Sequence, residues 1–263
     1  VRRECRKFYR QDRKNRKRFI NAKINENQYL MLRNAFSGGL THGNRFYSEC
    51  TVEGKIAHRD FVSHYPSCQM CYDFPVGKFS LYSEGGITLE ELHALEKDYC
   101  YIVDILIRDC VIKSKDVVLP IISVAKMMSG KMSKIEFHAD NGRVLEATGT
   151  FSLTVTELDL YWIERLYNFG EIYVGRVYVS KKGKLPRYMR DCINEFFFQK
   201  SDIKERVKRE TDESKKIDLE IDLMKSKNCL NGIYGMSATQ IVRELFSIDE
   251  NGEWKKEKVD DIA

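Results

Sequence analysis

A helical hairpin between Pro186 and Gly235 is the pattern that most constrains how this 263-residue chain can fold. We predict a first helix that reaches about Arg209, a polar turn near 211–214, and a second helix that ends at Tyr234. Leucines recur at helical spacing along the second helix, at Leu219, Leu223 and Leu230. Such a pair of helices buries its apolar stripes only when the helices pack antiparallel or against a neighbouring element.

The second predicted helix also carries a polar face. Lys227, Asn231 and Tyr234 lie at i, i+4 and i+7, so they share one side of the helix beside the leucines. A solvated helix surface is the simpler explanation of this set. The alternative is a binding face that offers a cation, an amide and a phenol to one ligand.

The segment before the hairpin favours strands. Tyr101 to Val111 is rich in Ile and Val, which predicts a strand in the middle of a buried sheet. Residues 135–151 predict a β-hairpin, because Asn141-Gly142 tolerates the positive φ values of a tight turn. A capping box at Thr156 predicts a helix through Tyr167, and 171–180 predicts a further strand. The predicted fold class is α+β, with a mixed or antiparallel sheet, helices and a helical hairpin.

Positive charge is concentrated near the start of the chain. The first 23 residues carry eleven Lys or Arg and two acids, although the net charge of the whole chain is only +5. We predict a basic helical region over 1–35. The asymmetry indicates a polyanionic partner, and a solvated basic helix end is the alternative.

The apolar stretches are too short to cross a membrane. The longest, 117–125, is interrupted by Pro120 and is far below the ~20 residues that a bilayer requires. No apolar stretch of a signal peptide follows the basic start, so a cytoplasmic location and reduced cysteines are expected. Cys68 and Cys71 lack the second Cys pair of a four-ligand zinc site and are interpreted as structural thiols.

Asp60 is a candidate ligand of Mg²⁺. Residues 52–62 predict two short strands, with Asp60 near the end of the second and Pro66 where a helix begins. Mg²⁺ prefers hard oxygen ligands, which the Asp60 carboxylate and the backbone carbonyl of Phe61 would supply. Taken alone, such an Asp is more often a turn residue or helix cap.

Two strings together resemble family B DNA polymerases. The family string Asp-x-x-Ser-Leu-Tyr-Pro-Ser is matched at Asp60, Ser63, Tyr65, Pro66 and Ser67, with His64 in place of Leu. The resemblance implies that Tyr65 stacks under the incoming sugar and excludes a 2′-hydroxyl, so that the substrate is a deoxynucleotide. It also implies that backbone amides near Ser63 and His64 contact the triphosphate, where the polar His64 changes the packing.

The second string is Lys-x-x-x-Asn-Ser-x-Tyr-Gly, matched at Lys227, Asn231, Tyr234 and Gly235 with Gly232 in place of Ser. The resemblance implies that Lys227 binds the α-phosphate and assists the leaving pyrophosphate. Asn231 would support the nucleotide, and Tyr234 with Gly235 would approach the nascent base pair. Lys200 and Lys204 resemble the cations of the family's fingers that grip the β- and γ-phosphates.

A third element precedes Asp60 by about 20 residues. It resembles the family's Tyr-x-Gly-Gly/Ala segment, which grips the template, with Phe36 in place of Tyr. Glycines allow the backbone to approach phosphates closely, and polar groups after them can donate hydrogen bonds. The candidate template- and primer-binding residues of this element are Phe36, Gly38, Gly39, Thr41, His42, Asn44 and Arg45.

The resemblance covers roughly residues 25–245 and implies an incomplete polymerase core. The expected parts are a basic linker helix region (1–35), a palm portion with an inserted region (36–185), helical fingers (186–235) and the start of a further palm segment (236–263). The family's second metal-binding string, Tyr-x-Asp-Thr-Asp-Ser, is not present. Asp260-Asp261 is not part of a Thr-Asp-Ser sequence and is not taken as that string. The residues of these strings are most similar to those of bacteriophage members of the family.

The expected function is template-directed DNA synthesis by two-metal nucleotidyl transfer, with Asp60 and Lys227 as catalytic residues. The implied cofactors are two Mg²⁺ ions, with Mn²⁺ as a substitute. The implied partners are primer-template DNA, dNTPs and a protein primer or other replication proteins, with no membrane. With one of two metal carboxylates, the isolated chain is expected to be inactive. A non-catalytic nucleic-acid-binding remnant is the main alternative, and Tyr65 disfavours a ribonucleotide polymerase or reverse transcriptase.

Overall fold

The computed structural model describes residues 24–37, 40, 43–47, 49–237, 243–248 and 254–259. These residues form two compact units. The sheet unit contains the described residues up to Asp60 together with Tyr72–Pro186, and the hairpin unit contains Phe61–Cys71 and the described residues from Arg187 onward. Residues 1–23 of the predicted basic helical region (1–35) lie outside the described residues. The predicted part boundaries at 35, 185 and 235 stay a prediction.

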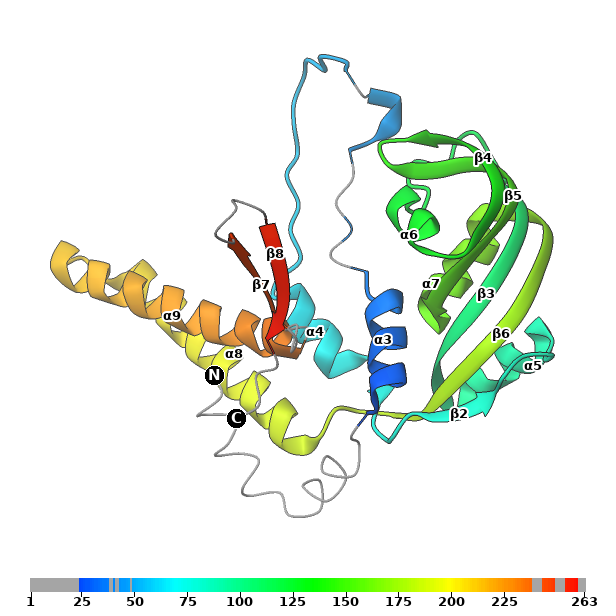
Figure 1. The fold of residues 1–263 in the computed structure, drawn as a ribbon. Coiled ribbons are helices and arrows are strands. Elements are labelled where there is room, and N and C mark those ends of the chain that lie inside the picture. Colours follow the sequence, from blue (N-terminus) through cyan, green and yellow to red (C-terminus); the bar gives the residue numbers. More distant parts are fainter. Residues whose placement is uncertain are drawn as a thin grey trace. The chain divides into compact units, whose positions relative to one another are not determined.

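The sheet unit is built on one antiparallel sheet, with the strand order β1-β6-β3-β5-β4 and β2 paired to β6 (Figure 1). Its strands are β1 (Phe74–Pro75), β2 (Ser80–Ser83), β3 (Tyr99–Ile112), β4 (Met132–Asp140), β5 (Arg143–Thr156) and β6 (Tyr167–Gly183). The Ile- and Val-rich segment is the central strand β3, so the prediction of a buried central strand is confirmed. All its pairings are antiparallel, as the α+β expectation allows.

The predicted β-hairpin and the helix after it are both present. Asn141 and Gly142 have φ values of 48° and 73°, and they join β4 to β5 as a two-residue turn in which Asp140 pairs with Arg143. Thr156 caps helix α7 (Glu157–Leu166) in a capping box with Asp159. Strand β6 follows immediately, so it starts earlier than the predicted residue 171.

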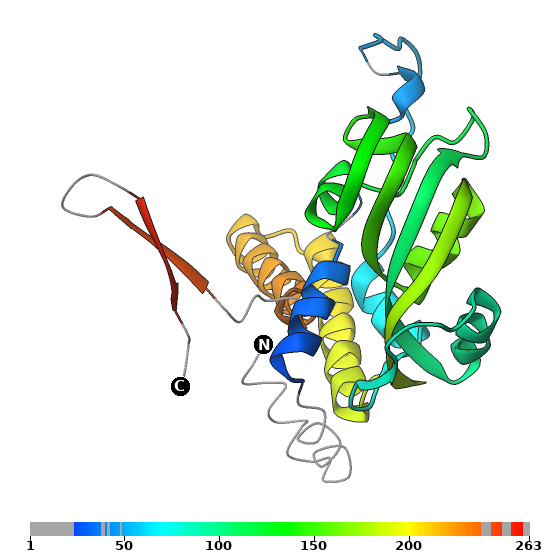
Figure 2. The ribbon, with the colours of Figure 1, turned by 45° about the vertical axis from the view of Figure 1, so that its right-hand side comes forward.

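The two faces of the sheet are covered by different helices. Alternate residues of β3 point to opposite faces, and its odd-numbered residues Tyr101 to Ile107 join the main core, which also contains residues of α7. On the other face, Ile102 packs with Met31 and Ala35 of α3 (Glu26–Ala35) (Figure 2). The remaining helices of this unit are α5 (Leu89–Ala94), α6 (Val124–Ser129) and the short 3₁₀ turns η1 (Arg45–Tyr47) and η2 (Leu95–Lys97).

A polar cluster fastens α5 and η2 to α7. His93 Nδ1 lies 2.9 Å from Glu96 Oε1, and His93 Nε2 lies 3.1 Å from Glu164. The buried Tyr101 donates its hydroxyl to the same Glu96 carboxylate at 2.8 Å. Burial alone would lower the pKa of His93, but the hydrogen bonds and charges of Glu96 and Glu164 outweigh it and raise that pKa above 6.5.

This raised pKa predicts a pH-dependent stability. Because the folded-state pKa of His93 exceeds the unfolded value, protonated His93 stabilises the fold fully below pH ~6.5, and that stabilisation is lost as pH rises through the folded pKa. We expect His93→Gln to lower the free energy of unfolding more at pH 5.5 than at pH 8, measured by urea denaturation. An equal loss at both pH values would contradict the prediction.

The prediction of two strands over 52–62 is wrong. Residues 51–60 form no strand and are exposed on all sides, with Ile56 88% exposed. A strand needs a partner for its backbone N–H and C=O groups, and no described strand pairs with this segment. Asp60 therefore does not stand at the end of a strand, and it is instead an exposed residue four positions before helix α4 (His64–Cys71).

The hairpin unit contains the predicted helical hairpin. Helix α8 (Arg187–Arg209) and helix α9 (Glu213–Ser237) are joined by three residues, which confirms the prediction within a few residues. Their core contains Cys192, Ile193 and Phe196 of α8 and Leu230 and Ile233 of α9. Strands β7 (Arg243–Ile248) and β8 (Trp254–Val259) pair as a separate antiparallel ribbon.

Two further expectations concern the chain as a whole. Among the residues that the structure describes, no helix is long and apolar enough to span a bilayer. The described cysteines form no disulfide, including Cys68 and Cys71 in α4.

Candidate functional site

The polar face predicted on α9 lies next to the buried face of the same helix. Leu230 and Ile233 are 1% and 4% exposed and pack on α8, while Lys227 and Asn231 are exposed. Tyr234 is half-buried. Lys227 follows the buried Ser226 and Asn231 follows the buried Leu230. The packing of these buried residues therefore fixes the direction in which Lys227 and Asn231 point.

Helix α4 brings Tyr65 onto this face. The ring of Tyr65 stacks on that of Tyr234, with centroids 4.0 Å apart and an interplanar angle of 10°. Pro66 stands in the first turn of α4, where a missing N–H costs no helical hydrogen bond, and it is buried. Met70 of α4 also packs on the core of the hairpin unit. Tyr65 and Tyr234, which are 169 positions apart in sequence, are therefore neighbours in the fold.

Lys200 is held against the start of α4. Its Nζ atom donates a hydrogen bond to Ser63 Oγ and lies 5.0 Å from the centre of the Phe197 ring. Ser63 has a φ of 49°, a left-handed value that is uncommon for a residue other than glycine. Its carbonyl accepts a hydrogen bond from Ser67 N–H at 2.9 Å, so this strained turn leads directly into the helix.

Three lysines of α8 and α9 share one electrostatic environment. Burial lowers the pKa of Lys200, and repulsion from Lys204 and Lys227 lowers it further. Two of the cations that the sequence predicted as phosphate ligands, Lys204 and Lys227, therefore act on the third, Lys200. A bound polyanion would relieve both the repulsion and the desolvation, which makes the cluster chemically suited to a triphosphate.

Asp60 and Phe61 are both exposed. Within the described part of the chain, Asp60 has no ion pair, and no group of three or more His, Cys, Asp or Glu side chains is placed to hold a metal ion. An exposed, unpaired carboxylate and a neighbouring carbonyl fit the oxygen preference of Mg²⁺ but supply only part of its shell. A metal at Asp60 therefore stays a proposal.

His64, the residue that departs from the family string, lies between two aromatic rings. Its ring centroid is 5.1 Å from that of Phe61 and 5.9 Å from that of Tyr65, and the side chain is exposed. A Leu at this place would contact the same rings without a hydrogen-bonding edge. His64 therefore adds a polar group beside Tyr65.

The predicted template-binding loop is described only in part. Phe36 is 55% exposed at the end of α3, and Asn44 accepts a hydrogen bond from Phe46 N–H at 3.1 Å. Gly38, Gly39, Thr41 and His42 lie outside the described residues.

Arg45 has a structural task that the sequence did not indicate. Its guanidinium donates to the carbonyls of Val117 and Lys115 and lies 4.0 Å from Asp140. It also covers the ring of Phe46 at 4.6 Å. These contacts fasten η1 to the segment around 115–117 of the same unit, so fewer N–H groups of Arg45 are open to a phosphate.

The comparisons with known proteins agree with the two strings. The family described as DNA polymerase type B, organellar and viral, matches residues 4–263. The chain belongs to this family of DNA polymerases. No protein with a curated description matches it.

Solved structures of phi29 DNA polymerase have a similar fold. The complex with primer-template DNA has a TM-score of 0.63 at 17% identity, covering 97% of this chain and 39% of that chain. The ternary complex with incoming nucleotide substrates has a TM-score of 0.61 at 18% identity, with the same coverage. The orthorhombic crystal form has a TM-score of 0.55 at 17% identity, covering 90% and 37%. The chain thus spans about two fifths of these polymerases and has the fold of part of a polymerase core.

Proposed function

We propose that this chain forms the nucleotide-binding part of a DNA-directed DNA polymerase that extends a primer with deoxynucleotides. The observation that carries the proposal is the contact of Lys200 with Ser63, two positions before the Tyr65 ring that stacks on Tyr234, with Lys204 and Lys227 near enough to repel Lys200. A cation cluster next to an aromatic platform suits a ligand with a triphosphate at one end and a planar base at the other. Family membership supports the same chemistry.

Each residue would have a distinct task. Lys227 would bind the α-phosphate, whose negative charge grows as the primer 3′-hydroxyl attacks. Lys200 and Lys204 would hold the β- and γ-phosphates, and Ser63 already positions the ammonium of Lys200. Tyr65 would support the sugar, and Tyr234, with Asn231 nearby on α9, would contact the base pair.

Asp60 and the carbonyl of Phe61 would hold Mg²⁺ together with a second carboxylate of the Tyr-x-Asp-Thr-Asp-Ser type, which this sequence does not contain. When bound, a pair of Mg²⁺ ions activates the primer hydroxyl and stabilises the leaving pyrophosphate. Primer-template DNA and dNTPs are the proposed partners, and phi29 DNA polymerase, which has this fold, is known in complex with both.

The proposal is tested by titrating the purified chain with dTTP in the presence of Mg²⁺, with binding measured by isothermal titration calorimetry. We expect saturable binding that inorganic pyrophosphate displaces, because the lysines grip phosphates, and no primer extension by the chain alone. Binding of DNA without any effect of dTTP would overturn the proposal and favour a non-catalytic DNA-binding protein.

A further inference from the structure

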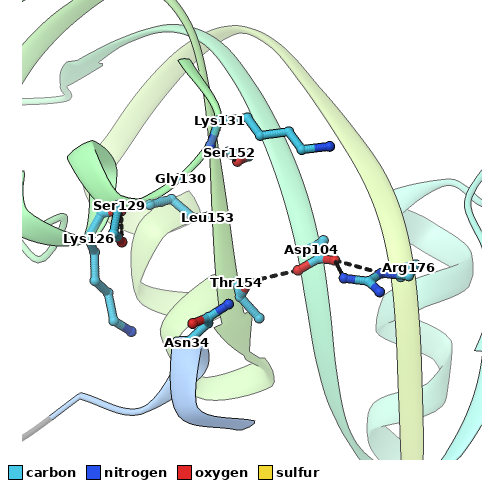
Figure 3. Close-up of a pocket in the computed structure, with 10 residues that line it drawn as sticks. All are labelled: Asn34, Asp104, Lys126, Ser129, Gly130, Lys131, Ser152, Leu153, Thr154 and Arg176. Carbon is cyan, nitrogen blue, oxygen red and sulfur yellow. Dashed lines mark hydrogen bonds and ion pairs between the residues drawn. The ribbon is translucent and has the colours of Figure 1, made fainter. Parts of the chain in front are cut away.

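The sheet unit contains a polar pocket that none of the polymerase strings includes (Figure 3). Its volume is about 480 Å³, which is within the usual range for small-molecule sites of ~300–1,000 Å³ and larger than one phosphate requires. Asn34 of α3, Lys126 of α6, Lys131 before β4, and Asp104, Thr154 and Arg176 of the sheet line it. Figure 3 shows Asp104 linked to Thr154 and Arg176, and it shows Lys126 and Lys131 at separate places with side chains that point in different directions.

The charge of this pocket is positive. Asp104 accepts two hydrogen bonds from Arg176, at 3.0 and 2.9 Å, and one from Thr154 at 2.7 Å. Both oxygens of this carboxylate are thus occupied and its charge is offset by Arg176. Neither Lys126 nor Lys131 has an ion pair within the described residues. Lys126 and Lys131 therefore give the lining of the pocket a net positive charge.

The backbone of each lysine is hydrogen-bonded within the sheet unit, and Lys126 N–H donates to Ser123 Oγ at 3.0 Å. Lys131 N–H donates to Ser152 Oγ at 2.8 Å, and Ser152 N–H donates to the Lys131 carbonyl at 2.9 Å. Between the lysines, Gly130 approaches β5 so closely that a Cβ atom would lie 2.1 Å from the Ser152 carbonyl oxygen. Any larger residue at 130 would push the segment off the strand, so the spacing of the two lysines is built into the fold.

The ammonium group of Lys126 can bind an anion. Its ammonium donates one hydrogen bond to the Ala35 carbonyl at 2.7 Å, which leaves two N–H groups for a ligand. Burial lowers the pKa of Lys126, with Arg143 adding repulsion and Asp159 opposing it. An anion in the pocket would compensate the partial desolvation of this cation. Asn34 and the unused N–H groups of Arg176 add donors that can meet a sugar or base.

We propose that this pocket binds a short stretch of a single DNA strand, with one phosphate on Lys126 and a neighbouring phosphate on Lys131. The site is distinct from the lysines of α8 and α9, and it does not require catalysis. A free nucleotide shares the same chemistry, and the experiment below separates the two sources.

The test measures binding of a fluorescein-labelled 12-residue oligothymidylate to the whole chain at several salt concentrations. Each phosphate contact contributes about −0.7 to the slope of log K against log salt for a single strand. For the double variant Lys126→Ala, Lys131→Ala we expect a slope less negative by about 1.4. The matched control Lys97→Ala, Lys115→Ala removes two exposed lysines of the same unit that do not line the pocket, and it should change the slope less.

Because Lys126 also binds Ala35, the single variant Lys131→Glu guards against a folding defect, since Lys131 is exposed. It should weaken oligothymidylate binding and leave dTTP binding unchanged. Equal slopes in the pocket and control variants would overturn the proposal. A loss of dTMP binding in Lys131→Glu with unchanged oligothymidylate binding would replace the strand by a free nucleotide. Loss of dTTP binding in Lys227→Ala is a separate readout, so either proposal can fail alone.

Discussion

Lys227→Ala should weaken binding of dTTP with Mg²⁺ by about 10- to 100-fold, because a hydrogen bond to a charged group contributes ~1.5–3 kcal/mol. Lys227 is exposed and makes no ion pair within the described residues, so its removal leaves the core of the hairpin unit intact. Alanine also maintains the helix. The loss would therefore report phosphate binding and not unfolding. Isothermal titration calorimetry measures it.

Lys225→Ala is the matched control. Lys225 lies two positions earlier on α9, is similarly exposed and pairs with Asp222 at 2.9 Å, so this variant removes one positive charge from the same helix. It should bind dTTP almost as the unchanged chain does. If both variants lost affinity equally, general attraction to a positive helix would explain the binding, and Lys227 would have no specific place on the α-phosphate.

Local patterns predicted the elements of the fold well. The Asn141-Gly142 turn, the Thr156 cap and the leucine spacing of α9 depend on neighbours within a few positions, and each appears as predicted. The prediction of strands over 52–62 was wrong because a strand needs a partner for its backbone groups, and a local pattern does not tell whether that partner exists. The family that the string at Asp60 indicated is confirmed, although the strand expected before Asp60 is absent.

Contacts between distant segments were beyond local patterns. Lys200 and Ser63 are 137 positions apart, and only the packing of α4 on α8 and α9 brings them together. Ser63 belongs to a family string and Lys200 resembles a cation of the fingers, but neither resemblance gave a reason for their contact. Arg45 is the opposite case, since its partners Val117 and Lys115 lie about 70 positions away and no local signal marked it as an anchor. The pocket around Lys126 likewise depends on the pairing of three strands and α3.

Tyr65→Ala should relax the discrimination between dATP and ATP. In the proposed complex the Tyr65 ring lies under the sugar, so a 2′-hydroxyl would collide with it, and overpacking of that kind costs ~1–3 kcal/mol. We expect the unchanged chain to prefer dATP by about tenfold or more and the variant to bind both nucleotides with similar affinity. Competition of each nucleotide against a fluorescent dNTP analogue measures the ratio.

A conservative variant, Tyr65→Phe, distinguishes the effect of the aromatic ring from that of the hydroxyl group. Tyr65→Phe keeps the aromatic face that stacks on Tyr234 at 4.0 Å, so it should keep the preference for dATP. Tyr65→Ala also removes that stacking, worth ~0.5–1.5 kcal/mol, and should weaken binding of both nucleotides somewhat. The ratio of the two affinities is therefore the informative quantity, because the lost stacking affects both nucleotides alike and the lost collision affects only ATP. An unchanged ratio in Tyr65→Ala would mean that another residue limits access to the 2′ position, and the exposed His64 beside the Tyr65 ring would be the next residue to vary.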